Sequence, residues 1–164
     1  MTSETGTHWS RESYHTDDTG WISFGAFLII GAVTYIATPN MAAEIEAFFR
    51  DFELVRVQIF QDITWFVPAH NHPVLYGAVE RFCYIFGLVQ VGILILRFAR
   101  GSSVHGKADT LSSIVFWVGL GYLLSLLSGE VLSWLSFLGA FVVLVGISIV
   151  TKELILILVP HGPK

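Results

Sequence analysis

The sequence contains few charged residues. Only 13% of its 164 residues are charged, whereas soluble domains carry about a quarter. Hydrophobic residues make up 54% of the chain, and the mean hydropathy is +0.67. So little polar side-chain surface cannot cover a fold that is surrounded by water. The composition therefore predicts an integral membrane protein.

Cysteine is nearly absent, since Cys83 is the only one. This excludes an intrachain disulfide and a zinc site built from several thiolates. The nine basic and thirteen acidic residues give a formal charge of -4 without a long block of either sign, so no nucleic-acid partner is expected. Phosphate-binding glycine loops, HExxH, nucleophile elbows and TVGYG filters do not occur. We therefore expect a non-enzymatic protein without a cofactor.

Four apolar stretches are long enough to cross a bilayer, which takes about 20 residues of helix. They cover residues of about 21–38, 73–100, 111–128 and 131–151. Proline suits the first turn of a helix, so Pro73 is expected to open the second span. The sequence predicts an all-α fold in which residues 1–164 form a single domain, a four-helix transmembrane bundle.

The connection between the third and fourth spans is expected to be little more than Ser128-Gly129-Glu130. Such a short link predicts a tight antiparallel hairpin of the two helices. It also places Glu130 in the first turn of the fourth span, where the positive end of the helix dipole would stabilise its carboxylate.

Residues 40–56, between the first and second spans, have the pattern of an amphipathic helix. Asn40 is a plausible N-cap, and apolar residues recur at helical spacings of three and four: Met41, Ile45, Phe48, Phe49, Phe52 and Val55. The segment is too charged to span a membrane, so we expect it at the interface. Its net acidic polar face favours packing on protein over adsorption to anionic lipid.

The distribution of lysine and arginine indicates the orientation of the chain. If residues 1–20 form a polar cytoplasmic segment, six basic residues fall inside and two outside, with Arg81 within the second span. The six are Arg11, Arg97, Arg100, Lys107, Lys152 and Lys164, and the two are Arg50 and Arg56. We therefore expect a multi-pass protein of the cell membrane with both termini in the cytoplasm.

The stretch WFVPAHNHP places His70 and His72 just before the second span. Histidine is a common metal ligand, and both rings would lie on one side of an extended segment. Asp62 and Glu80 are the acidic residues expected at the same level, but no third histidine or thiolate is available there. Ordinary interfacial polar residues explain the pattern better, so no metal site is expected.

Three polar residues interrupt the second span: Glu80, Arg81 and Gln90. Charged groups in a span usually face the bundle interior or a water-filled path, which would allow a proton or ion relay. Glu80 lies only about 10 Å beyond Pro73 along the helix, so it and Arg81 can instead reach the headgroups. A structural ion pair within the bundle is the third interpretation.

Small residues in the third and fourth spans favour close helix packing. They are Gly121, Ser125, Ser128, Ser136 and Ala140. At the end of the fourth span Lys152 and Glu153 interrupt the apolar run, and LILILVP follows. A helix that continues through this segment is longer than the hydrocarbon core. We therefore expect Leu154, Leu156 and Leu158 to contact a partner.

Three segments resemble a group of small archaeal membrane proteins of unassigned function that share four spans. They are GWISFGAFLIIGA, HPVLYGAVERFCYIFGLVQVGILILRF and KADTLSSIVFWVGLGYLL. The resemblance covers about Gly20 to Val150. It implies a prokaryotic cell membrane and four helices, and it implies no activity and no site residues.

These observations predict a structural or accessory membrane subunit, or a small homo-oligomer. Its partners would be the lipid bilayer and either other membrane subunits or a second copy of the chain. The alternative is a small transporter or channel for an ion or solute that uses Glu80, Arg81 and Gln90.

Overall fold

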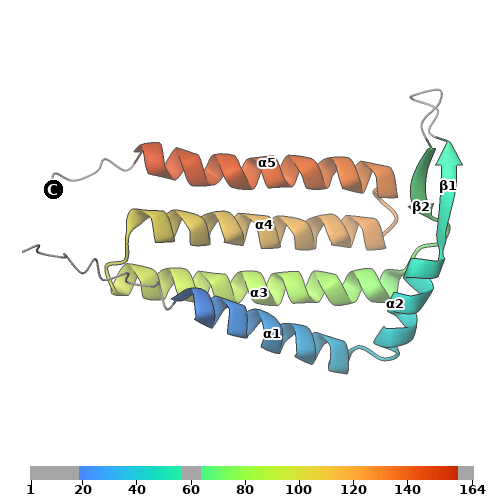
Figure 1. Cartoon of the computed structure of the whole chain (residues 1–164), viewed down its shortest axis with the longest axis horizontal. Coiled ribbons are helices and arrows are strands. Elements are labelled where there is room, and N and C mark those ends of the chain that lie inside the picture. The colour runs from blue at the N-terminus through green and yellow to red at the C-terminus, as the bar shows by residue number, and fades with distance from the viewer. Residues whose placement is uncertain (1–18, 57–63, 159–164) are drawn as a thin grey trace, which may run out of the picture.

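The computed structural model describes residues 19–56 and 64–158 of the chain (Figure 1). These ranges contain five helices and two strands: α1 (Thr19–Ala37), α2 (Met41–Arg50), β1 (Phe52–Arg56), β2 (Thr64–Pro68), α3 (Pro73–Ala99), α4 (Val104–Ser128) and α5 (Trp134–Leu158). Four helices, α1, α3, α4 and α5, are long and apolar enough to cross a membrane. The chain is thus a helical, multi-pass membrane protein with a small amphipathic helix after the first span, as the sequence predicted.

The four long helices lie side by side in the order α1, α3, α4, α5, and each runs antiparallel to its neighbour (Figure 1). The contact between α3 and α4 is the most extensive, and that between α1 and α3 is the smallest of the three. We call the end that carries α2 and the two strands the hairpin end. The opposite end, where α1 begins and α5 finishes, is the termini end.

The buried core lies between α3, α4 and the beginning of α5. Its most buried members are Tyr76, Cys83, Leu124, Leu127 and Phe137. Helix α1 joins this core mainly through the ring of Phe27, which lies 5.2 Å from Phe82 and 6.1 Å from Trp117 between ring centroids. Because α1 contributes so few buried side chains, it forms one edge of the row.

Glycine allows the close approach of α4 to both of its neighbours. A Cβ atom on Gly121 would lie 2.9 Å from Cε1 of Tyr84 on α3, so the packing role predicted for Gly121 is confirmed. A Cβ atom on Gly119 would collide with Leu144 on α5. A hydrogen bond also joins α4 to α5, since Ser112 Oγ donates to the Ser148 carbonyl at 2.6 Å.

The prediction of one helix over residues 40–56 is wrong for its last part. Helix α2 ends at Arg50, and β1 pairs antiparallel with β2 from Phe52 opposite Pro68 to Arg56 opposite Thr64. The aromatic and β-branched sequence TWFVP provides a strand partner that outweighs the helical spacing of Phe52 and Val55. Asn40 precedes α2 with a φ of 55°, but its side chain forms no capping hydrogen bond.

The loops beside α4 also differ from the sequence-based expectation. Helix α4 begins at Val104, with Ser103 as its cap, because hydropathy marks the apolar part of a helix and not its polar first turns. Helix α5 begins at Trp134, so Glu130 is not in its first turn. Glu130 adopts a φ of 57° in the connecting turn, and Ser133 Oγ accepts from the Ser136 N–H instead.

Candidate functional site

A polar cluster at the hairpin end contains both histidines of the WFVPAHNHP stretch. Asp51 directly follows α2, and its two carboxylate oxygens lie 2.7 Å from His70 Nδ1 and 3.1 Å from His72 Nε2. The His70 backbone N–H also donates to Asp51 at 2.7 Å, and the Ala69 N–H donates to the Asp51 carbonyl. One aspartate thus fastens the loop before α3 to the end of α2.

The hydrogen bonds of this cluster shift the titration of two of its members. The ring and the backbone N–H of His70 stabilise the charged carboxylate and lower the pKa of Asp51 to about 2. In turn, the hydrogen bond to Asp51 and the charge of that carboxylate raise the pKa of His70 above 6.5. The cluster therefore favours a charged pair at mildly acidic pH.

Asn71, between the two histidines, contacts the turn between α4 and α5. Its Nδ2 donates to the Ser128 carbonyl at 3.3 Å and to Glu130 Oε1 at 3.1 Å. Three successive loop residues therefore bridge α2 on one side and the α4–α5 turn on the other. Glu130 acts as a hydrogen-bond acceptor for this loop.

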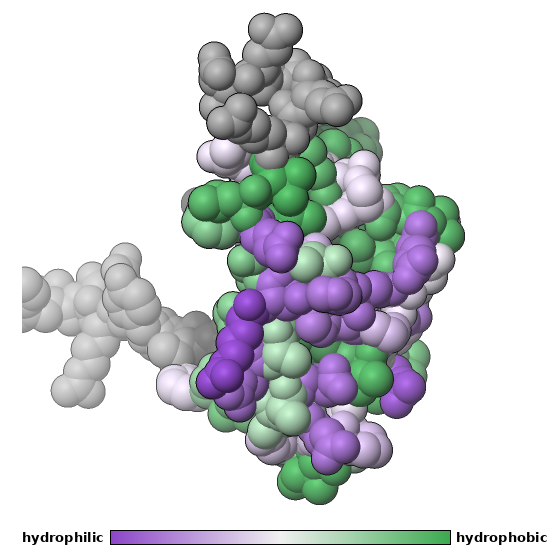
Figure 2. Space-filling view, turned by 90° about the vertical axis from the view of Figure 1, so that its right-hand side faces the viewer, coloured by the Kyte–Doolittle hydropathy of each residue, from purple (hydrophilic) through white to green (hydrophobic). Residues whose placement is uncertain are grey.

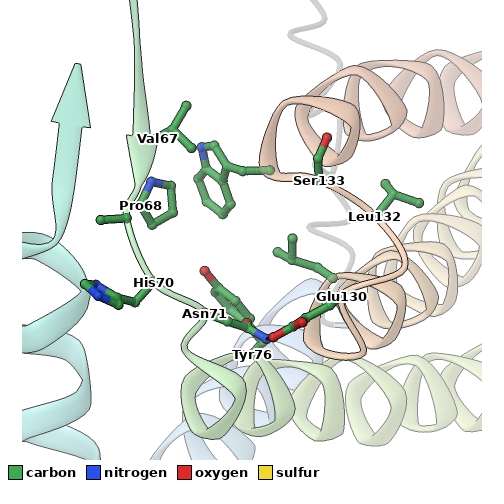
Figure 3. A pocket seen from close by; sticks show the side chains of 11 residues that line it. Val67, Pro68, His70, Asn71, Tyr76, Glu130, Leu132 and Ser133 are labelled. Atoms are coloured by element: carbon green, nitrogen blue, oxygen red, sulfur yellow. Dashed lines mark hydrogen bonds between the residues drawn. The ribbon is translucent and has the colours of Figure 1, made fainter. Parts of the chain in front are cut away.

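A hollow of about 320 Å³ lies between β2 and the α4–α5 turn (Figure 3). Val67, Pro68, Leu132 and Trp134 supply apolar walls. Tyr76 is only 5% exposed and rises from α3 with its hydroxyl directed into the hollow. The hollow has the mixed lining that a small ligand with one polar group would need.

The histidines do not form a metal centre with the residues seen around them. Among the residues that the structure describes, no group of three His, Cys, Asp or Glu side chains is arranged to hold a metal ion. Asp62, the third candidate ligand, lies outside the described residues. The structure instead pairs His70 and His72 with Asp51, which the sequence offered only as part of the polar face of an amphipathic helix.

The three polar residues of the second span do not come together. Glu80 is half-buried and Arg81 is exposed, and neither side chain forms an ion pair or hydrogen bond with another described residue. Gln90 is 5% exposed, and its Nε2 donates to Ser23 Oγ of α1 at 2.7 Å. Ten residues separate Gln90 from Glu80, which corresponds to about 15 Å along the helix and about 80° around it.

Gln90 belongs to a second hollow, an open crevice of about 420 Å³ between α1, α3 and α4. Aromatic rings share its lining with six polar residues: Ser23, Gln90, Arg97, Asp109, Thr110 and Ser113. Arg97 donates to the Gly106 carbonyl, and Asp109 pairs with Lys152 of α5 at 2.8 Å. Polar side chains thus line a crevice beside α1 in the termini half of the spans.

The apolar segment after Lys152 continues as helix to Leu158. Leu154 and Leu158 are 52% and 68% exposed, and Leu156 is half-buried. The exposed leucines extend the apolar outer edge of the row that α5 forms.

No protein-family model, curated protein or solved structure matches the chain.

Proposed function

We propose that the protein is a non-enzymatic membrane subunit that assembles with itself or with other membrane proteins. The polar-lined crevice beside α1 is the observation on which this proposal rests. The crevice lies between helices that are long and apolar enough to cross the membrane, and it is open at the outer surface of the helix row. Part of the hydrogen-bonding capacity of its polar side chains is used within the chain, since Gln90 donates to Ser23 and Thr110 donates to the Gly106 carbonyl. Lipid tails cannot satisfy the capacity that remains, so a protein neighbour that fills the crevice is favoured.

The arrangement of the helices in a row supports the same proposal. In a row, α1 and α5 each have one main helix neighbour. The apolar windows of α1 and α5 are 0% and 11% buried, against 28% for α3. Lipid can cover such edges, but they also leave room for a second copy or another subunit. On α5, Leu154, Leu156 and Leu158 are the proposed contact.

The mass of the assembly in lipid nanodiscs or mild detergent tests this function. We expect an oligomer or a complex, and a monomer alone would contradict the proposal. Ser113→Phe fills the crevice and should shift the mass towards the monomer. Leu88→Phe adds a ring on the exposed side of α3, outside the crevice, and should leave the mass unchanged.

Transport of an ion or solute is the second candidate function. The observation in its favour is that Gln90 lies at the crevice, where water could enter beside it. Glu80→Gln and Gln90→Leu should then abolish a cation- or proton-dependent flux into liposomes while circular dichroism stays unchanged. If both variants retain the flux of the original protein, these side chains do not carry it.

We further propose that the termini end faces the cytoplasm of a prokaryotic cell. The described basic residues of this end, Arg97, Arg100, Lys107 and Lys152, outnumber those of the hairpin end, which supports this orientation. In a Cys83→Ala background, a membrane-impermeant thiol reagent added to intact cells should label Ala69→Cys and not His105→Cys. The opposite labelling would reverse the topology.

A further inference from the structure

We propose that the β1–β2 hairpin is an arm that lies in the lipid headgroup layer beside α5 and inserts its apolar side chains there. This interaction with the membrane surface is separate from the assembly proposed above. Four side chains carry it: Leu54, Val55, Trp65 and Phe66.

Both faces of the hairpin are apolar. In the strand register Leu54 lies opposite Phe66, and Val55 lies opposite Trp65. Since successive side chains point to opposite faces, the first pair occupies one face and the second pair the other. Leu54 and Phe66 are each 63% exposed, and Val55 and Trp65 are 45% and 46% exposed. A two-stranded sheet with two such faces has little stability in water.

The base of the arm is fixed to the helices, so its direction is set by the fold. The ring centroid of Phe52 lies 5.0 Å from that of Phe48 and 6.1 Å from that of Trp134. The Ala69 N–H donates to the Asp51 carbonyl at 2.9 Å, directly beside the strands. The hairpin therefore starts from contacts with α2 and α5.

The strands run across the axes of the long helices and reach the outer edge of α5 (Figure 1). Seen onto the hairpin end, the arm is a hydrophobic block above a hydrophilic band that crosses the helix ends (Figure 2). A bilayer that α5 crosses lies perpendicular to α5, so its surface runs parallel to the arm. The space next to the arm and beyond α5 is therefore the headgroup region of the surrounding lipid.

The chemistry of the arm fits this layer. Tryptophan and other aromatic side chains are enriched at membrane interfaces, where one part of the ring is apolar and the rest is hydrated. Asp51 and Glu53 lie at the base of the arm, and their charges oppose attraction to anionic lipid. Burial of apolar surface must therefore drive the contact, and added salt, which screens these charges, should not weaken it.

Spin labels can measure the depth of the arm. In the full-length Cys83→Ala protein in liposomes, nitroxides are placed at Phe66→Cys, at Val143→Cys within α5, and at Ala69→Cys on the polar end face. Power saturation then compares collisions with oxygen, which concentrates in lipid, and with a water-soluble nickel chelate. The Phe66 label should lie between the other two, about 5–10 Å below the headgroup boundary, and added salt should not move it towards water.

Two results would overturn the proposal. A Phe66 label as accessible to nickel as the Ala69 label would place the arm in water. A label shielded from both oxygen and nickel would place it against protein, such as a second copy. As a second measurement, Leu54→Ser/Phe66→Ser should raise the nickel accessibility of a label at Trp65→Cys several-fold and leave the Val143 label unchanged. An unchanged Trp65 label would also contradict membrane insertion.

Discussion

Different kinds of contact hold the helices together at the hairpin end and at the termini end. At the hairpin end, Trp134 packs among Phe48, Tyr76 and Phe137 with ring centroids 5.6–6.4 Å away, and Asp51 holds two histidines. At the termini end a short loop joins α3 to α4, and the ion pair of Asp109 with Lys152 is solvent-accessible. The comparison indicates that the hairpin end fixes the arrangement of the helices. The termini end stays open around a polar crevice.

Removing an aromatic ring from each end should give the largest difference. Trp134→Ala takes away a half-buried ring with four aromatic neighbours and should cost about 3 kcal/mol of unfolding free energy. Phe98→Ala removes a ring that is 62% exposed and contacts Lys107, so it should cost less than about 1 kcal/mol. Unfolding in mixed micelles by a denaturing detergent measures both. Equal costs would refute the difference between the ends.

Neutralising one aspartate at each end should give a smaller contrast. Asp51→Asn weakens hydrogen bonds to two imidazole rings and one backbone N–H, whereas Asp109→Asn loses one exposed ion pair. The melting temperature should therefore fall further for Asp51→Asn. Protease digestion of the folded protein should also become faster near residues 64–72 in this variant alone. A greater loss for Asp109→Asn would reverse the comparison.

The stability of the hairpin end should depend on pH in two steps. The lowered pKa of Asp51 adds stability that is complete above its ordinary pKa of 3.8 and is lost as the pH falls towards 2. The raised pKa of His70 adds stability that is complete below 6.5 and is lost as the pH rises through the shifted pKa. The hydrogen-exchange protection factors of residues 64–72, which correct for the intrinsic pH dependence of exchange, should be highest between these limits. The Asp51→Asn variant should lose this maximum.

The smallest expected effect concerns the contact between α4 and α5 in the termini half. Ser112→Ala removes the hydrogen bond to the Ser148 carbonyl and should cost about 0.6 kcal/mol, a typical value for such bonds in membrane proteins. Thr151→Ala is the matched control, because Thr151 donates only to Ile147 of its own helix. If both variants lose the same stability, the bond between the helices contributes nothing of its own.

The sequence predicted the four spans because each must fill a bilayer with apolar side chains, which leaves a strong local signal. Pro73 was identified as the start of α3 for an equally local reason. The strand β1 was missed because Phe52 and Val55 fit the helical spacing, and only the distant segment TWFVP decides between the two structures. Local pattern cannot settle such a competition.

The candidate sites were predictable in part. The two histidines can be recognised as candidate site residues from their residue type alone. Asp51, however, lies 19 and 21 residues before its two partners, and no spacing rule connects them. Gln90 can be recognised from the sequence as a polar residue in a span. Its partner Ser23 gives a weaker signal, a hydroxyl in an uncharged apolar run. The crevice itself depends on how α1 packs against α3 and α4, and local sequence patterns do not determine such tertiary packing.

The row of helices has a consequence for how the protein folds and unfolds. Each long helix mainly contacts the next one in the row, as the units of a repeat protein do. Stability in such an arrangement is close to a sum of nearest-neighbour interfaces, and cooperativity weakens towards the outermost units. Helix α1, which has the smallest interface, should therefore separate first when the protein is pulled or heated. The pair α3 and α4 should be the last to separate and the first to form.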